Sequence, residues 1–184
     1  MKIPEISVKE MEGRVARYKN MEGASLAYLD QRIPGHEREI INLVGLASMA
    51  ENVIENKDDP TTAPLIPFGA HGFNVQIARA ENGGGAALHN HQTEEVFMPL
   101  IGNWSIFWLK GEKEQEVILE PFDVIHLPTL IFRGFRYVGE GTGALLALIG
   151  GPDAGKIDWH PSVIEEARAT GLEVDDDGVL VSTA

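Results

Sequence analysis

The chain has 184 residues, of which 43% are hydrophobic and 23% charged, a composition typical of a globular protein that can bury a core. Its formal net charge of -13 argues against nucleic acid or an anionic membrane as a partner, because both attract a positive surface. The absence of cysteine excludes disulfides and thiolate metal sites, and without a long apolar run or a signal-peptide pattern we expect a cytoplasmic protein with no membrane segment.

Residues 1–66 are predicted to form an N-terminal arm, with strands that pack on a barrel. Within this arm, "ASLAYLD" (residues 24–30) predicts one short strand and "EIINLVGL" (residues 39–46) predicts another. The segment from residue 48 to residue 70 is rich in turn residues and is expected to be a loop.

Residues 67–151 have a different sequence pattern, in which short apolar runs alternate with glycine, proline or charged turns. Such regular spacing predicts an antiparallel sandwich or barrel, because no segment here is long and periodic enough to be a crossover helix. The expected strands lie within "GFNVQIARA", "EEVFMPLIG", "NWSIFWLKG", "QEVILEP", "DVIHLP", "LIFRGFRYVG" and "GALLALIGG".

Residues 152–184 are predicted to contain a short helix and an acidic tail. In "HPSVIEEARATG", Ser162 precedes Glu165 by three residues, which is the spacing of a capping box, and Gly171 stands where a helix would end. This pattern predicts a helix of about two turns. The following "EVDDDG" lacks the alternating spacing of a calcium loop and is interpreted as a solvated turn.

Two histidines and a carboxylate stand close together in the stretch "GGGAALHNHQTEEVFMPLIG". On a β-strand, His89 and His91 face the same side because successive side chains alternate between the two faces. Glu95 follows a short turn and can bring an oxygen to the same point. Imidazole and carboxylate ligands suit iron, manganese, nickel or zinc, so this cluster predicts a site for one divalent metal ion of unknown identity.

The spacing of Gly83, His89, His91, Glu95 and Gly102 resembles the first motif of the cupin superfamily at every specified position. The resemblance covers about residues 70–150. It implies an all-β, cupin-type double-stranded β-helix (jelly-roll) barrel. Because the barrels of that family commonly pair, it also implies a homodimer.

The second cupin motif is degenerate in this chain. Pro128 matches it, but Phe122 and Leu130 replace its two glycines. Arg133 stands where the family has its third histidine, and Tyr137 takes the place of the asparagine. Arginine has donors but no lone pair, so Arg133 cannot be a metal ligand.

Two interpretations of Arg133 remain open. In the first, His89, His91 and Glu95 hold a metal with open positions for substrate and dioxygen, and Arg133 clamps an anionic substrate. Tyr137 is then the available proton donor. In the second, Arg133 pairs with Glu95, its charge replaces the metal, and the pocket binds a small anion without chemistry.

The other histidines have weaker claims to the site. Because Ile125 and Leu127 match inward apolar positions of the family, we expect His126 to face outward. The histidines interpreted as turn or surface residues are His36, His71 and His160.

Three functions therefore follow from the resemblance. The first is a metal-dependent enzyme, with a non-haem dioxygenase acting on a small anionic or aromatic compound as its leading form. The second is a sensor or binding protein without turnover, and the third is an isomerase or lyase. The fold alone does not choose among them.

Overall fold

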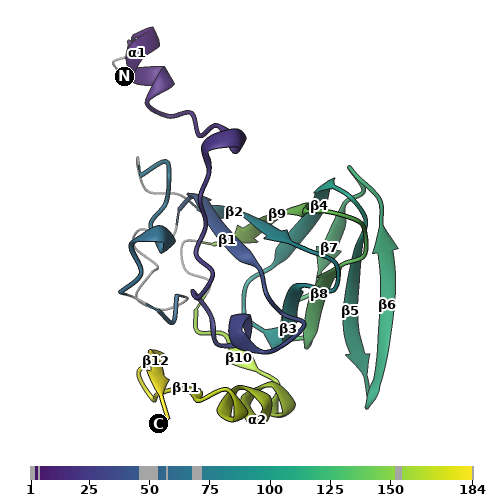
Figure 1. Cartoon of the computed structure of the whole chain (residues 1–184). Coiled ribbons are helices and arrows are strands. Elements are labelled where there is room, and N and C mark those ends of the chain that lie inside the picture. Colours follow the sequence, from purple (N-terminus) through teal and green to yellow (C-terminus); the bar gives the residue numbers. More distant parts are fainter. Residues whose placement is uncertain are drawn as a thin grey trace.

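The computed structural model describes residues 3, 5–45, 54–56, 58–67, 72–151 and 155–183, and most of its elements belong to two five-stranded sheets (Figure 1). The first sheet has the order β1 (Glu39–Val44), β2 (Phe73–Ala80), β9 (Gly143–Gly150), β4 (Glu95–Ile101), β7 (Ile125–Leu127). The second has the order β10 (Asp158–Trp159), β3 (Gly85–Asn90), β8 (Arg133–Tyr137), β5 (Trp104–Lys110), β6 (Lys113–Leu119). Neighbouring strands are antiparallel, which confirms the predicted all-β fold.

The chain crosses repeatedly between the sheets after β2. Strand β3 belongs to the second sheet, β4 to the first, β5 and β6 to the second, β7 to the first, β8 to the second and β9 to the first. As a result, the end of β3 and the starts of β4 and β8 meet at one end of the sandwich. This crossing order brings together residues that are more than 40 positions apart in the sequence.

Alternating burial along the strands places the core between the two sheets. In β4, Glu95, Phe97 and Pro99 are buried, while Val96 and Met98 are half-buried. Such alternation is expected for a strand with one face on the core. The largest fully buried apolar side chains of this core are Trp104, Tyr137, Phe97, Leu29, Ile54, Ile106 and Leu145.

The N-terminal arm corrects one prediction. Residues 24–30 do not form a strand: Ala24 makes only an isolated bridge to Ile40, and the 3-10 helix η2 (Leu29–Arg32) begins at Leu29. The reason is the Gln31 side chain, which accepts from the backbone N–H of Ala27 and Tyr28 and donates to the carbonyls of Ala24 and Arg38. One buried amide thus occupies backbone groups that a neighbouring strand would otherwise pair.

The arm also contains the helix α1 (Val8–Glu12) and the 3-10 helices η1 (Tyr18–Asn20) and η3 (Pro60–Thr62). In Figure 1, α1 projects away from the two sheets. Strand β1 ties the arm to the first sheet through its pairing with β2, and it ends at Val44 rather than at the predicted residue 46, which lies outside the described residues.

The C-terminal segment contains α2 (Pro161–Ala169), β11 (Leu172–Val174) and β12 (Leu180–Ser182). The predicted helix is confirmed, but its cap is not Ser162: His160 precedes the helix, and its imidazole accepts from the backbone N–H of Ser162. The predicted division of the chain at residues 66 and 151 stays a prediction. Among the described residues, no helix combines the length and apolar character needed to cross a bilayer.

The two positions where the second motif departs from glycine keep a glycine-like backbone. Phe122 has φ = 74° and Leu130 has φ = 64°, and these are the non-glycine residues with positive φ in the described part of the chain. Side chains other than glycine rarely adopt this left-handed conformation. Both positions therefore have a backbone conformation that glycine would adopt without strain.

Candidate functional site

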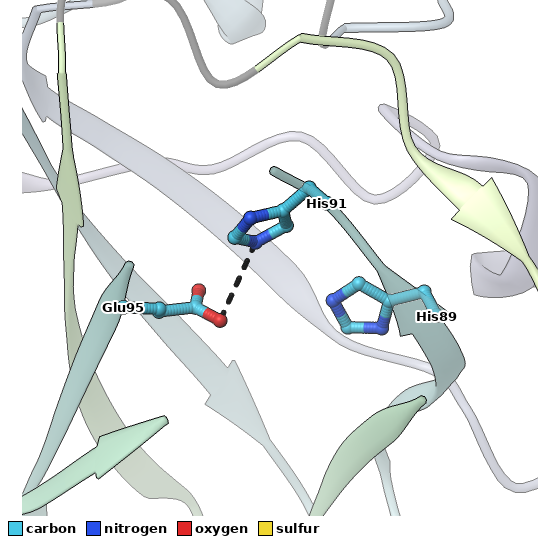
Figure 2. Close-up of side chains that lie close together, drawn as sticks. All are labelled: His89, His91 and Glu95. Atoms are coloured by element: carbon cyan, nitrogen blue, oxygen red, sulfur yellow. Dashed lines mark ion pairs between the residues drawn. The ribbon is translucent and has the colours of Figure 1, made fainter. Parts of the chain in front are cut away.

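The side chains of the two histidines and the glutamate of the first motif lie close together (Figure 2). His89 lies on β3, His91 follows that strand directly, and Glu95 is the first residue of β4. One ligand atom from each residue lies within 4.8 Å of the others, and all three residues are buried. We call these three residues the His–His–Glu cluster.

Backbone carbonyls fix the orientation of both imidazole rings. Nδ1 of His89 lies 2.8 Å from the carbonyl oxygen of Ala87, and Nδ1 of His91 lies 3.1 Å from that of Thr93. A carbonyl can only accept, so Nδ1 of His89 carries the proton and its Nε2 keeps the lone pair. For His91, whose Nδ1 also lies 3.0 Å from Thr93 Oγ1, the same tautomer follows because its Nε2 faces the Arg133 Nη2 donor. Hydrogen bonds of this kind from the distal ring nitrogen are common behind metal-ligating histidines.

Arg133 supplies a positive charge to the cluster from the start of β8. Its Nη2 donates to Glu95 Oε2 over 2.7 Å and to His91 Nε2, and its Nη1 donates to the carbonyl of His89 over 3.0 Å. Arg133 is only 2% exposed. These are the contacts of the second interpretation, in which the guanidinium pairs with Glu95.

Burial and Arg133 together set the charges of the cluster. Burial alone would raise the pKa of Glu95, but the Arg133 guanidinium and then His91 outweigh it and lower the pKa to about 2. Burial, followed by Arg133, holds the pKa of His89 well below its usual value. The cluster therefore presents an ionised carboxylate beside a neutral imidazole over the ordinary pH range.

This donor set fits a divalent metal ion. Two imidazoles with unprotonated Nε2 atoms and one ionised carboxylate are suitable ligands for iron, manganese, nickel or zinc. Arg133 is the feature that opposes metal binding, since its Nη2 contacts two of the three ligand atoms. A carboxylate has a second oxygen, so Glu95 can bind a cation while Oε2 remains with Arg133.

A cavity of about 50 Å³ adjoins the cluster inside the sandwich. Its apolar wall includes Phe97, Phe135, Leu145, Ile149 and Trp159. The Trp159 ring lies 5.5 Å from the His89 ring, centroid to centroid. One water needs roughly 10–15 Å³ of such space, so the cavity holds only a few waters or a ligand of a few heavy atoms.

The structure places Tyr137 outside this cavity wall. Its ring packs against Trp104, with 5.3 Å between the centroids, and its hydroxyl donates to the carbonyl of Glu140. Arg133 is likewise absent from the wall, and its two terminal nitrogens are engaged by the cluster and by β3. Phe135, between them on β8, does line the cavity.

The remaining histidines lie away from the cluster or outside the described residues. His126 is more than half exposed, and its Nε2 lies 3.7 Å from Glu94, so it faces outward as expected. His160 caps α2, and the carbonyl of His36 accepts from Arg38. His71 lies outside the described residues.

Three polar residues of the cavity wall come from outside the motifs, and sequence reasoning missed them. They are Tyr28, Arg38 and Gln76. Gln76 carried a weak signal, because it shares the inward face of β2 with Asn74 and Ala78 although it is polar. Tyr28 and Arg38 carried none, because only the tertiary fold brings the arm to the cavity.

Comparison with solved structures found similar folds at low sequence identity. An oxalate oxidase matches with a TM-score of 0.53 and 15% identity, over 82% of this chain and 66% of its own length. A cupin 2 domain-containing protein from Halorhodospira halophila matches with a TM-score of 0.49 and 16% identity, over 72% of this chain and 77% of its own. A double-stranded β-helix protein from Klebsiella pneumoniae matches with a TM-score of 0.42 and 16% identity, over 48% of this chain and 71% of its own.

No family model matches the sequence, and no curated protein does. At 15% identity, the likeness to the oxalate oxidase shows a shared fold and carries no activity with it.

Proposed function

The chain has the double-stranded β-helix fold of the cupin superfamily, and from this premise we propose that it is a metal-dependent enzyme acting on a small organic compound. One divalent ion is held by the His–His–Glu cluster, and the adjoining cavity holds the substrate. Iron, manganese, nickel and zinc all suit this ligand set. When bound, the metal supplies positive charge and open coordination positions at the head of the cavity.

One observation carries this proposal. Both Nε2 lone pairs and the Glu95 carboxylate converge within 4.8 Å, while both Nδ1 atoms are held by carbonyls. Buried acceptor groups are costly to bring together unless each of them has a partner. Arg133 balances the charge of Glu95 and contacts the His91 ring, whereas at His89 it donates to the backbone carbonyl and not to the ring.

Each protein group has a separate part in the proposed reaction. Arg133 is a positioning residue, because it keeps Glu95 ionised and fixes the carboxylate on the inner face of β4. Trp159 stands beside His89 and, with Phe135, excludes water from the cavity. A dry wall strengthens the electrostatic interactions of the cluster with any substrate.

We propose that the enzyme is an oxygenase. Small organic acids are the first substrates to test. A facial set of two histidines and one carboxylate leaves positions open for substrate and dioxygen. The small cavity excludes large compounds. One structurally similar oxalate oxidase has been solved in complex with the substrate analogue glycolate, which makes two- and three-carbon acids a reasonable starting panel.

A second candidate is a metal-free binding protein. The observation in its favour is the contact of Arg133 Nη2 with both His91 Nε2 and Glu95 Oε2, since the guanidinium already satisfies two of the three donors. In that case the cavity binds a small ligand without turnover.

Metal stoichiometry separates the two candidates. Protein purified without a histidine tag or chelator is analysed by plasma mass spectrometry, and chelator-treated protein is titrated with zinc, manganese, nickel and iron(II). We expect one ion per chain in the wild type, and a loss of that ion in His89→Ala and Glu95→Gln. The matched control is His126→Ala, an exposed histidine beside Glu94, which should keep the wild-type stoichiometry.

Each result of the titration supports one candidate and rejects another. If the wild type binds no ion even after reconstitution, the metal-dependent enzyme is ruled out and the binding protein stands. If an iron-loaded wild type consumes oxygen with a small acid and His89→Ala does not, the oxygenase is supported. A loaded protein with no oxygen uptake across the panel rejects the oxygenase and leaves the isomerase or lyase class.

We also propose that the protein is a cytoplasmic homodimer. The chain has no cysteine, as suits a protein that needs no disulfide. Helix α1 buries none of its residues, and its exposed Val8 and Met11 are available to a second copy. Light scattering of the wild type and of a Val8→Ser, Met11→Ser variant tests this, because only the wild type should have the mass of two chains.

A further inference from the structure

Two buried donor groups of the cavity wall have no hydrogen-bond partner in the part of the chain that the structure describes. They are Nε of Arg38 and Nε2 of Gln76. The two residues are only 7% and 6% exposed. Because an unpaired buried donor carries a desolvation cost, most such groups in proteins are paired. These two are therefore available to a partner that enters the cavity.

The phenol of Tyr28 lies in the same cavity wall as these two donors. The guanidinium carbon of Arg38 lies 5.7 Å from the ring centroid of Tyr28 and 5.9 Å from that of Phe135, so it sits between two aromatic walls of the cavity. Burial raises the pKa of Tyr28 to about 12, against the opposing effect of the neighbouring Gln76 side chain. The hydroxyl therefore remains protonated and can donate. We call Tyr28, Arg38 and Gln76 the donor cluster.

The charges of the donor cluster are already balanced. Both terminal nitrogens of Arg38 donate to the carboxylate of Asp30, at 2.9 Å each. At the other cluster, Arg133 is paired with Glu95 through one terminal nitrogen, Nη2. Without a bound metal, a carboxylate placed between these pairs would lose its hydration without meeting an excess of positive charge, which is costly in an apolar cavity. A neutral carbonyl oxygen loses much less and can accept the same hydrogen bonds.

We propose that the donor cluster is a subsite for the carbonyl oxygen of a neutral group, such as an amide, ester or ketone. The carbonyl accepts from the donor cluster, while the rest of the ligand points toward the His–His–Glu cluster. The second half of this statement rests on the proposed function, but the first does not. The volume of about 50 Å³ limits the ligand to a few heavy atoms.

Propionamide and propionate are matched probes, because they have the same shape and differ in charge. Their dissociation constants are measured by ligand-observed NMR with the full chain, first chelator-treated and then loaded with zinc. In the chelator-treated protein, we expect propionamide to bind at least tenfold more tightly than propionate. Gln76→Met and Tyr28→Phe should each weaken propionamide binding by about tenfold, the usual value of one hydrogen bond.

The controls are substitutions of the same kind on the surface. Tyr18→Phe removes a partly exposed phenol, and Gln115→Met removes an exposed amide on β6. Both should bind propionamide as the wild type does. Thermal melting verifies that each variant is folded, and one folded donor-cluster variant suffices for the test.

The outcomes separate this inference from the proposed function. Equal or tighter binding of propionate in the chelator-treated protein, or unchanged propionamide binding in the folded donor-cluster variants, overturns the subsite. A preference for propionamide that persists when the chain binds no zinc supports the subsite and rejects the metal site. Zinc binding without that preference rejects the subsite and leaves the metal site standing.

Discussion

Arg133 and Glu95 form a buried ion pair, with 2.7 Å between Nη2 and Oε2 and almost no exposure of either side chain. The pair joins the first residue of β8 to the first residue of β4, and therefore joins the two sheets. A buried charge without its partner is far more costly than the pair itself. This asymmetry makes the pair a sensitive point for both stability and metal binding.

Removing the guanidinium should destabilise the protein strongly. Arg133→Met is expected to lower the free energy of unfolding by about 3–5 kcal/mol, because Glu95 is left buried and unpaired. Urea denaturation measures the loss. Arg168→Met, which breaks the exposed pair with Glu173, should cost less than about 1 kcal/mol. Equal small losses in the two variants would show that Glu95 does not depend on Arg133.

Metal should compensate for the lost guanidinium. Because a divalent ion provides positive charge to Glu95, zinc should raise the melting temperature of Arg133→Met by more than it raises that of the wild type. The measurement is a thermal scan with and without a stoichiometric amount of zinc. A smaller zinc effect in the variant would mean that Arg133 is needed to hold the metal ligands in place.

Glu55 should make stability depend on pH. Burial raises its pKa from 4.5 to about 7, although its carboxylate accepts from the backbone of Leu29 and from the indole of Trp159. The folded state thus binds a proton that the unfolded state releases, so this contribution is full below about pH 4.5 and is lost as the pH rises through about 7. The rise in pKa corresponds to about 3 kcal/mol.

Other groups titrate in the same range, so the effect of Glu55 is isolated by difference. His89 works in the opposite sense, because its lowered pKa removes stability as the pH falls below its unfolded value. The stability of the wild type minus that of Glu55→Gln should therefore fall with rising pH between about 4.5 and about 7. A flat difference across that window would contradict the raised pKa of Glu55.

Restoring glycine to the second motif should stabilise the fold. Phe122 and Leu130 hold positive φ angles, and their side chains are 72% and 66% exposed, so little burial is lost on truncation. Phe122→Gly and Leu130→Gly should each raise the free energy of unfolding by about 0.5–1 kcal/mol, as relief of backbone strain exceeds the added entropy of the unfolded chain. Val124→Gly is the control: Val124 is also exposed but lacks a positive φ, and its loss should destabilise.

Tyr137 should behave as a core residue. Tyr137→Phe removes only the hydrogen bond to the carbonyl of Glu140 and is expected to cost about 1 kcal/mol, with metal stoichiometry unchanged. Gly143→Ala should cost more, about 1–3 kcal/mol, because a methyl group there overlaps the Tyr137 ring. Chemical denaturation and elemental analysis of the two variants test this. Loss of metal in Tyr137→Phe would assign the phenol to the site instead.

Local pattern was enough to predict several parts of this molecule. Short alternating runs between turn residues predicted the strands of both sheets except β10, because burial of one strand face leaves a period of two in the sequence. The same period placed His89 and His91 on one face, and their spacing to Glu95 predicted the cluster. The helix at residues 161–169 was predicted from its ends, although its cap proved to be His160.

The arm was harder to predict because its backbone partners are side chains. Gln31 occupies three backbone groups that the predicted strand would have offered to a neighbour, and a fourth group, the carbonyl of Arg38. A single amide can do this only when the fold holds it in place, and no local pattern records that arrangement.

The sequence by itself determined most strands of residues 67–151 and the three side chains that could bind a metal, since both depend on spacing within about 20 residues. Only the tertiary structure decided that Arg133 donates to Glu95 and His91. It also decided that Tyr28, Arg38 and Gln76 share one cavity wall. These contacts join segments separated by tens of residues. They depend on the order in which the strands cross between the two sheets, which alternation within a single strand does not specify.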